Sequence, residues 1–386
     1  METSLMNTSP EAFDSIRPYR DEEVEEVLER LAEDQEFLTA LLRFKFPRLA
    51  NSFLAPLLRR VISQLLKKRL AKIHSVHDLQ LYVAGYMARM LATTTQGFNV
   101  DGLEELDKNQ SYLFISNHRD IAMDPALVNY ALHTEGMNTV RIAIGDNLLQ
   151  KPWVTDLMRL NKSFIVKRSA KGVREMMNSF KLLSEYIHHS LKNENHSIWI
   201  AQREGRAKNG IDHTDPAIIK MFGMAKKKSV MPPAEVLASL NIVPVALSYE
   251  YDPLGVQKSR EVVTKEQEGE YAKAEFEDIL SIAQGISGFK GRVQVAFGKP
   301  LTAEDMPTPD AAAKAVDEQI RRLYRLFPSN YLALEALDEL GDIAVPEFDT
   351  ATRAAFNEQL AACPQEYRKQ WLTMYANPVK NYLRRL

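Results

Sequence analysis

The chain has 386 residues, of which 45% are hydrophobic and 26% are charged, and its net charge at pH 7 is −2. These values are ordinary for a globular protein and exclude a collagen-like, low-complexity or disulfide-scaffold sequence. The single cysteine, Cys363, cannot form an internal disulfide and no cysteine cluster can hold a structural zinc ion, so we expect a cytoplasmic protein. Residues 1–15 have no basic start and no apolar centre, and no apolar run is long enough for a membrane span, so we expect neither a secretory signal nor a transmembrane helix.

Charge is distributed unevenly over the first part of the chain. Residues 1–36 carry twelve acidic residues against three arginines, whereas residues 37–77 carry nine Lys and Arg residues and no acid. Apolar residues from Phe53 to Leu66 recur at helical spacing, which predicts an amphipathic helix. The cations left for another face of this helix are Arg59, Arg60, Lys67 and Lys68.

A basic amphipathic helix with aromatic residues is typical of helices that lie in a membrane interface. We therefore predict an anionic membrane surface as a partner and a peripheral association with the membrane. The alternative is a helix that packs on the protein's own core with its charges toward water. Nucleic acid is not expected as a partner, because the few aromatic residues here fall within the apolar pattern.

From about residue 96, short apolar runs alternate with helical stretches. The expected strands are residues 98–100, 112–116, 140–144, 163–167, 197–201, 242–249 and 292–297, and the expected helices between them are 125–134, 147–159, 171–191, 215–228, 232–239 and 265–284. Helical patterning returns at 308–327 and 351–386, and Pro300, Pro307, Pro309, Pro328 and Pro346 mark breaks in this tail.

This order of elements predicts an α/β fold with a mixed sheet flanked by helices, preceded by N-terminal amphipathic helices and followed by a helical C-terminal tail. The expected domains are residues 1–95, a helical region and membrane-docking candidate; residues 96–305, an α/β catalytic domain; and residues 306–386, a helical extension.

Four blocks of polar residues stand where expected strands end. They are NHRDIAMD (117–124), FIVKR (164–168), REGRAK (203–208) and IVPVALSYE (242–250). In open α/β sheets, functional side chains collect at such junctions. In the first block, His118 suits a general base, since neutral imidazole accepts a proton and a carboxylate fixes its tautomer. The carboxylate is Asp124, six positions later, or Asp120, two positions later.

Each block also has a purely structural interpretation. Asp124 before Pro125 is a good helix start, with the aspartate as N-cap. Cations at a strand end are often only solvated, and the third block has the composition of a tight turn. Pro244 inside an apolar run suggests an edge strand or a bulge.

Taken in order, the four blocks resemble the motifs of the glycerol-3-phosphate and lysophospholipid acyltransferase superfamily. Those motifs are H-x-x-x-x-D, a strand ending in F-I-x-R, an E-G-T-R or E-G-G-R-S turn, and an apolar strand with V-P-V. The resemblance covers about residues 96–300. It implies a catalytic part for His118 with Asp124 or Asp120. It also implies substrate binding by Arg168, Glu204, Gly205 and Arg206, and a structural or acyl-contacting role for Pro244.

Three features depart from the family pattern. The interval between His118 and Asp124 holds one residue more than H-x-x-x-x-D. Lys162 stands where the second motif usually has glycine, and Arg206 follows Glu204 after only Gly205. Lys208 is an additional candidate for binding a phosphate, which Arg and Lys side chains contact by charge-assisted hydrogen bonds.

The function implied is transfer of a fatty acyl group from a thioester, acyl-coenzyme A or acyl-carrier protein, to a hydroxyl of glycerol 3-phosphate or a lysophospholipid. Such chemistry needs no metal and no cofactor beyond the co-substrate. The alternative is a membrane-surface binding protein that keeps this fold without chemistry. Other enzyme classes fit poorly: HRD at 118–120 lacks the glycine-rich loop of a kinase, no G-x-S-x-G occurs, and the glycines of GISGFKG (285–291) are wrongly spaced for a dinucleotide site.

Overall fold

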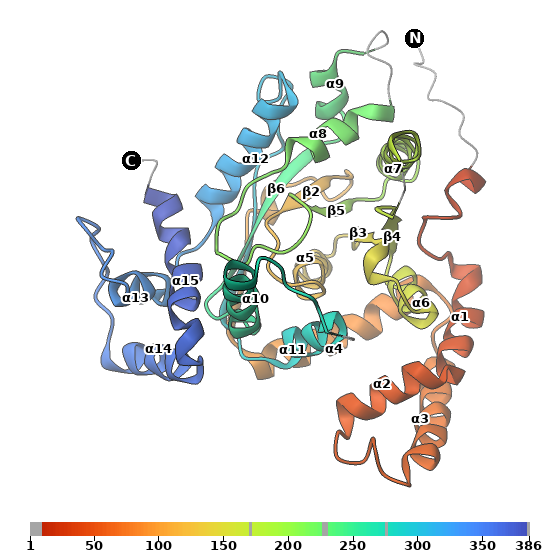
Figure 1. Cartoon of the computed structure of the whole chain (residues 1–386). Helices are drawn as coiled ribbons and strands as arrows, with labels where there is room; N and C mark the ends of the chain where they lie inside the picture. The colour runs from red at the N-terminus through yellow and green to blue at the C-terminus, as the bar shows by residue number, and fades with distance from the viewer. Residues whose placement is uncertain (1–9, 170–171, 226–230, 275–276, 384–386) are drawn as a thin grey trace. The chain divides into compact units, whose positions relative to one another are not determined.

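The computed structural model describes residues 10–169, 172–225, 231–274 and 277–383 (Figure 1). The chain divides into two compact units. The first unit consists of Met1–Tyr86 and Thr139–Ile198, and the second of Met87–Asn138 and Trp199–Leu386. Among the described residues, no helix is both long and apolar enough to cross a membrane.

The first unit contains helices and one pair of strands. Its elements are α1 (Asp21–Glu33), α2 (Gln35–Lys45), α3 (Ala55–Leu70), the greater part of α4 (Val76–Thr94), β3 (Arg141–Gly145), α6 (Pro152–Leu160), β4 (Ser163–Val166) and α7 (Val173–Lys192). Strands β3 and β4 are parallel, with Ile142 opposite Ser163. Helix α2 packs on α3 through Leu42, which contacts Leu58 and Ile62 in one apolar cluster.

The second unit contains most of the sheet and the C-terminal helices. Its elements are β1 (Thr95–Asp101), β2 (Leu113–Ser116), α5 (Met123–Thr134), β5 (Ile198–Ala201, from Trp199 on), α8 (Pro216–Phe222), α9 (Pro233–Ala238), β6 (Ile242–Tyr249), α10 (Gly255–Glu268), α11 (Glu277–Ser287), β7 (Gly291–Phe297), α12 (Pro309–Leu323), α13 (Pro328–Ala336), α14 (Thr350–Ala362) and α15 (Arg368–Leu383).

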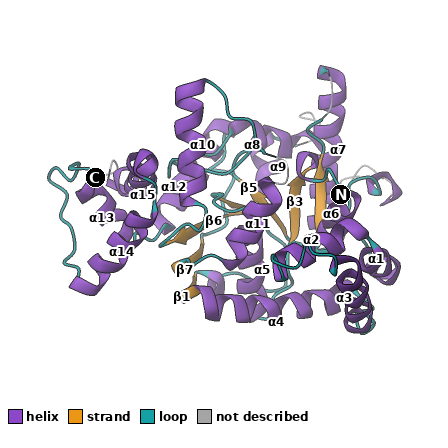
Figure 2. Ribbon diagram, turned by 60° about the horizontal axis from the view of Figure 1, so that its bottom comes forward, coloured by secondary structure: helices purple, strands orange, loops and turns teal. Residues whose placement is uncertain are grey.

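The strands of the second unit follow one another in the order β1-β7-β6-β2-β5. The β1–β7 and β2–β6 pairs are parallel and the β6–β7 pair is antiparallel, so the sheet is mixed. Figure 2 shows β1 and β7 side by side. All eight residues of β6 are buried, as expected for an interior strand that reads as a continuous apolar run. The predicted fold class is therefore confirmed, whereas the domain boundaries at residues 95 and 305 stay a prediction.

Pro244 lies in this interior strand. The expectation of an edge strand or bulge is therefore wrong, since β6 has β7 on one side and β2 on the other. Pro244 is opposite Ile115 of β2, and its carbonyl accepts a hydrogen bond of 2.8 Å from the backbone of Gly298. The strand accommodates the proline because only the proline nitrogen, and not its carbonyl, is lost to the ladder.

All seven expected strands are present, but the expectation of one helix at 265–284 is wrong. This segment holds parts of two helices, α10 and α11, because Gly269 ends α10 in the left-handed conformation at φ 85°. Pro328 marks a break between helices as expected, since α12 ends at Leu323 and α13 begins with Pro328 as its first residue. Proline is favoured there because the first helical residue has no partner for its N–H group.

The C-terminal helices α13, α14 and α15 gather together (Figure 1). Trp371 and Tyr375 of α15 form the centre of an apolar cluster with Phe356 of α14 and Tyr251, which follows β6. The rings of Trp371 and Tyr375 are 4.4 Å apart between centroids. Helix α15 also packs on α10. The tail is thus built into the second unit at the end of β6.

Candidate active site

His118 is presented by the end of β2 in the second unit. Asn117, which precedes it, is fully buried and forms two hydrogen bonds with the backbone of Leu247 in β6, at 2.9 and 2.8 Å. These bonds continue the contact between β2 and β6 beyond the last paired residues. The side chain of His118 is 15% exposed, so the imidazole is fixed by its surroundings and still accessible.

The imidazole of His118 forms a hydrogen bond with Asp124. Its Nδ1 lies 2.8 Å from Oδ2 of Asp124, which marks Nδ1 as the protonated nitrogen and leaves Nε2 as the basic one. The ring of Trp199 lies edge-on to the imidazole, with 5.7 Å between centroids, and the indole N–H donates to Ser116. The orientation of the imidazole is thus determined by the carboxylate of Asp124 and by the indole ring of Trp199.

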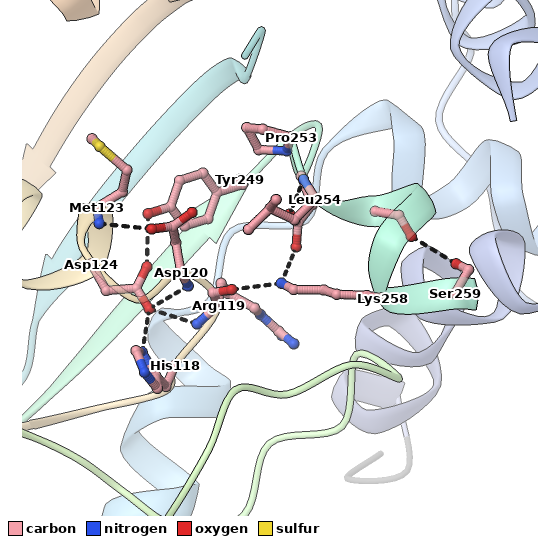
Figure 3. A network of polar contacts seen from close by, with 12 residues as sticks. His118, Arg119, Asp120, Met123, Asp124, Tyr249, Pro253, Leu254, Lys258 and Ser259 are labelled. Atoms are coloured by element: carbon pink, nitrogen blue, oxygen red, sulfur yellow. Dashed lines mark hydrogen bonds and ion pairs between the residues drawn. The ribbon is translucent and has the colours of Figure 1, made fainter. Parts of the chain in front are cut away.

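Asp124 is completely buried and accepts hydrogen bonds on both oxygens (Figure 3). Besides His118, its Oδ2 accepts from the backbone N–H groups of Arg119 at 2.5 Å and Asp120 at 2.9 Å, and its Oδ1 accepts from the Tyr249 hydroxyl at 2.7 Å. Burial by itself raises the pKa of Asp124, but the bonds from His118, Asp120 and Tyr249 outweigh it and hold the pKa below its ordinary value. Asp124 is therefore a carboxylate.

Asp120 makes different contacts. Its Oδ1 accepts from the backbone N–H groups of Ala122 at 3.0 Å and Met123 at 2.9 Å, at the start of α5. Asp120 therefore caps this helix, and the interpretation of Asp124 as the N-cap is wrong, since α5 already begins at Met123. Oδ2 of Asp120 is buried without a hydrogen-bond partner among the described residues. Burial and the nearby charge of Asp124 raise the pKa of Asp120.

Arg119 is a buried residue that the sequence blocks did not single out for a role. Its guanidinium donates to Asp212 at 2.6 Å and lies over the ring of Tyr324, 5.6 Å from the centroid. Burial raises the pKa of Asp212, and the positive charge of Arg119 opposes this effect. The ion pair fixes the side chain of Arg119, and its backbone N–H donates to Asp124.

The third block forms a turn after β5 that contacts His118. The backbone N–H of Ala207 donates to the carbonyl of His118 at 2.8 Å. Gly205 has φ 75°, a conformation that favours glycine. Nη1 of Arg206 is buried and has no hydrogen-bond partner within the described part of the chain. Lys208 forms an ion pair with Glu261 of α10, and Glu204 is exposed.

The residues predicted from sequence are divided between the two units. His118, Asp124, Asp120 and the third block belong to the second unit, as does Pro244. Arg168 belongs to the first unit, where its backbone N–H donates to Asp146 at 3.0 Å. Sequence reasoning missed the remaining contacts of the site, which are made by Tyr249, Asp212, Trp199, Lys258 and Asp252.

Only Tyr249 had a signal in the sequence, because it stands inside the fourth block. Within the described residues, no group of three or more His, Cys, Asp or Glu side chains has the arrangement of a metal site. The groups that the structure brings together around His118 are an oriented imidazole, a buried carboxylate and a partly buried guanidinium.

Comparison with known proteins gives one family match and one structural likeness. Residues 97–248 match the family model described as Acyltransferase, a range that begins in β1 and ends in β6. No curated protein matches the chain significantly. Among solved structures, the chain is similar to the 1-acyl-sn-glycerophosphate (LPA) acyltransferase PlsC from Thermotoga maritima, with 13% identity and a TM-score of 0.38. That match covers 82% of this chain and 100% of the other.

Proposed function

We propose that this chain transfers a fatty acyl group from a thioester to a hydroxyl of glycerol 3-phosphate or a lysophospholipid, because residues 97–248 match the family model described as Acyltransferase. His118 is the general base of this reaction and Asp124 its partner. The observation that carries the proposal is the bond of 2.8 Å between Nδ1 of His118 and the buried carboxylate of Asp124. This bond leaves Nε2 free of the carboxylate and able to take up a proton.

The proposed reaction has two steps. Nε2 of His118 accepts the proton of the acceptor hydroxyl while the hydroxyl oxygen attacks the thioester carbonyl and forms the new C–O bond. The tetrahedral intermediate then expels the thiolate, which takes the proton back from the imidazolium. Asp124 stabilises the imidazolium between these steps, and a positioned base of this kind contributes about 10²–10⁴-fold to the rate.

Arg206 is the proposed ligand for the acceptor phosphate. A buried guanidinium nitrogen without a hydrogen-bond partner is costly in the free protein, and a phosphate oxygen would satisfy it. Lys208 is already paired with Glu261, so we assign it a supporting role in which it holds the turn. Arg168, Glu204, Gly205 and Pro244 stay candidates for acceptor or acyl contacts, in line with the resemblance of their blocks.

The assay that tests the proposal uses the purified full chain with acyl-coenzyme A and acyl-carrier protein as donors. Acceptors are glycerol 3-phosphate, lysophosphatidic acid and other lyso-lipids, including amino-acid lipids, and products are identified by mass spectrometry. We expect one donor–acceptor pair to give product and His118→Ala to abolish it. His133→Ala, at the far end of α5, is the matched control and should stay active.

Product formation by His118→Ala at the wild-type rate would contradict the role of the base. If the wild-type protein forms no product with any pair but binds lipid vesicles, the alternative of a membrane-surface protein without chemistry is favoured.

The proposed surface for membrane docking lies on α2, α3 and the segment between them. Helix α3 has two apolar faces. Leu58 and Ile62 pack against Leu42, whereas Leu57, Val61 and Leu65 are exposed by 59%, 47% and 53% and recur every four residues on a different face. The other exposed apolar residues of this surface are Phe44, Phe46, Leu49, Phe53 and Leu54, and Phe53 is 91% exposed.

Exposed cations surround these apolar side chains. They are Arg43, Lys45, Arg48, Arg60 and Lys68. An exposed apolar face bordered by cations fits an anionic lipid surface, in which apolar side chains enter the acyl boundary and cations contact the headgroups. Docking through this surface would bring the protein to the membrane that contains a lipid acceptor.

Sedimentation with vesicles tests this surface. We expect the wild-type protein to bind vesicles that contain anionic lipid and the triple variant Leu57→Ser, Val61→Ser, Leu65→Ser to lose most of this binding. Leu280→Ser is the matched control, because Leu280 is 65% exposed but lies on α11 in the second unit. Undiminished binding by the triple variant would exclude this face as the docking surface.

A further inference from the structure

Lys258 carries an ionisable amine in an almost completely buried position. It lies on α10, outside all four sequence blocks, and is 2% exposed. Burying an ammonium group is costly unless it is paired and hydrogen-bonded, so such a residue is retained for a specific contact. We propose that Lys258 is a positioning residue for the His118–Asp124 pair and acts through the carbonyl of Arg119. This inference rests on the proposed function.

Two partners satisfy the ammonium group (Figure 3). Nζ of Lys258 donates to the carbonyl oxygen of Arg119 at 2.6 Å and forms an ion pair with Asp252. Burial lowers the pKa of Lys258, and the charge of Asp252 opposes this effect. The lysine therefore joins the helix α10 to the turn that follows His118.

The geometry of the peptide bond turns this contact into a constraint on the active site. In a planar trans peptide, the C=O of one residue and the N–H of the next point in opposite directions. The carbonyl of Arg119 points to Lys258, so the N–H of Asp120, in the same peptide plane, points the other way. On that side it donates to Oδ2 of Asp124 at 2.9 Å. Lys258 and Asp124 thus hydrogen-bond to opposite sides of the same peptide group, which joins Arg119 to Asp120.

The turn needs such a constraint because no regular structure fixes it. Residues 117–122 belong to neither a strand nor a helix, and the interval from His118 to Asp124 is one residue longer than H-x-x-x-x-D. Asp212 fixes the side chain of Arg119, and Lys258 fixes its carbonyl. Oδ2 of Asp124 therefore receives two backbone N–H groups together with the imidazole, despite the extra residue.

The partner of Lys258 is itself fixed by the C-terminal tail. The backbone N–H of Asp252 donates to the hydroxyl of Tyr375 on α15 at 2.7 Å, and Oδ1 of Asp252 accepts from the backbone of Leu254 at 2.8 Å. A small cavity lined by Arg119, Asp252 and Tyr375, among others, lies beside these groups. An unbroken series of polar contacts thus runs from α15 through Asp252, Lys258 and Arg119 to Asp124.

The experiment compares variants that differ in the amine alone. Lys258→Met by itself leaves the carboxylate of Asp252 without its cation and endangers folding. The double variant Lys258→Met/Asp252→Asn removes both charges, keeps the net charge and keeps an oxygen for Leu254. Asp252→Asn alone retains the amine and its bond to Arg119. Ser259→Ala is the matched control, because Ser259 is a buried neighbour on α10 whose hydroxyl donates to Gly255 of the same helix.

We expect the double variant to lose kcat by about 10²-fold, because small displacements of catalytic groups have effects of this size. The acceptor KM should change by less than about twofold, since Lys258 does not contact substrate in this proposal. Asp252→Asn should retain clearly more activity than the double variant, and Ser259→Ala should match the wild type.

The outcomes separate this inference from the proposed function. An inactive wild type would overturn both. An active wild type, an inactive His118→Ala and a folded double variant with wild-type kcat would overturn the role of Lys258 alone. A double variant with a raised acceptor KM and unchanged kcat would also overturn it, because it would place Lys258 in substrate binding.

Discussion

The buried carboxylate of Asp124 shows how single residues determine the properties of this site. A carboxylate removed from water costs several kcal/mol unless hydrogen bonds replace its hydration. Here four donors do so: His118, two backbone N–H groups and Tyr249. Asp120, only four residues away, has one oxygen in a helix cap and the other unpartnered, so its pKa is raised where that of Asp124 is lowered. Two neighbouring aspartates thus have different chemistry because their donors differ.

The two aspartates should therefore respond differently to the same substitution. Asp124→Asn should lower kcat by about 10²–10⁴-fold, the contribution typical of an oriented general base. Asp120→Asn keeps the capping oxygen for Ala122 and Met123 and removes a poorly solvated carboxyl, so it should retain kcat within about tenfold. Steady-state kinetics at saturating donor and acceptor measure both. A larger loss in Asp120→Asn would transfer the role of partner to that residue.

Arg206 gives a second prediction at the residue scale. Its unpartnered Nη1 is proposed to bind the acceptor phosphate, and charge-assisted hydrogen bonds contribute about 1.5–3 kcal/mol each. Arg206→Met should therefore raise the acceptor KM by at least about tenfold while the donor KM stays unchanged. Lys220→Met, on α8, is a control of similar chemical type. An unchanged acceptor KM in Arg206→Met would contradict the assignment.

At the scale of the elements, the connection between α6 and β4 explains one departure from the family pattern. Lys162, which stands where the family usually has glycine, has φ 60°, the left-handed conformation that glycine adopts without strain. Its ammonium group donates to the carbonyl and hydroxyl oxygens of Thr139, at 3.1 and 2.8 Å, and lies 3.1 Å from Nε2 of His196. These contacts join the segments before β3, β4 and β5 and offset the backbone strain. Burial lowers the pKa of Lys162 to about 8.

This cluster predicts sensitivity of the first unit to acid. Burial, followed by the charges of Lys162 and Arg141, lowers the pKa of His196 to about 3, whereas an unfolded histidine titrates at about 6.5. Between pH 6.5 and about pH 3 the unfolded chain therefore binds up to one more proton than the folded chain, and as the pH falls the free energy of unfolding decreases by up to about 1.4 kcal/mol per pH unit. Above pH 6.5 this effect is absent.

Thermal unfolding at pH 5 and pH 7.5 measures this difference. His196→Gln cannot titrate and should lose less stability between these two values than the wild type. His133→Gln is the control, since its ring is not in this cluster. An equal loss of stability in the wild type and in His196→Gln would show that His196 is protonated in the folded protein.

At the scale of the whole molecule, the distribution of charge matters more than its sum. The net charge of −2 gives no general attraction to an anionic surface, but residues 37–77 carry cations alone. The proposed attraction to an anionic membrane is therefore local to α2 and α3, and the apolar residues exposed there would add a contribution that salt does not screen. Lys67 contributes less than its neighbours, because it is paired with Glu33 of α1.

Vesicle binding should accordingly depend on salt, because the Debye length shortens from about 10 Å at 0.1 M to about 3 Å at 1 M. Affinity for anionic vesicles should fall as salt increases and reach the residual level set by the apolar residues. Arg60→Glu/Lys68→Glu should lose both the affinity and its salt dependence. Lys314→Glu/Lys369→Glu changes the net charge equally at exposed positions of the second unit and should bind like the wild type. Salt-independent binding would leave no role for the cations.

Much of the fold and part of the candidate site could be predicted from the sequence, because these features depend on residues that are close together along the chain. Strands such as β6 are predicted by local apolar runs, and His118 could be identified as a candidate because it follows directly after a predicted strand. The break between α10 and α11 was missed, since the helical pattern continues on either side of Gly269. The two apolar faces of α3 could not be told apart, because periodicity does not say which face has a neighbour.

The sequence by itself determined the order of the strands, the four polar blocks and the two candidate aspartates, all of which depend on neighbours along the chain. The tertiary structure decided that Asp124 partners the imidazole of His118, because the donors that distinguish it from Asp120 include Tyr249, 125 residues away. It also joined Arg119 to Asp212 across 93 residues and to Lys258 across 139. Contacts at such separations follow from the packing of the sheet and helices, for which local residue patterns carry no signal.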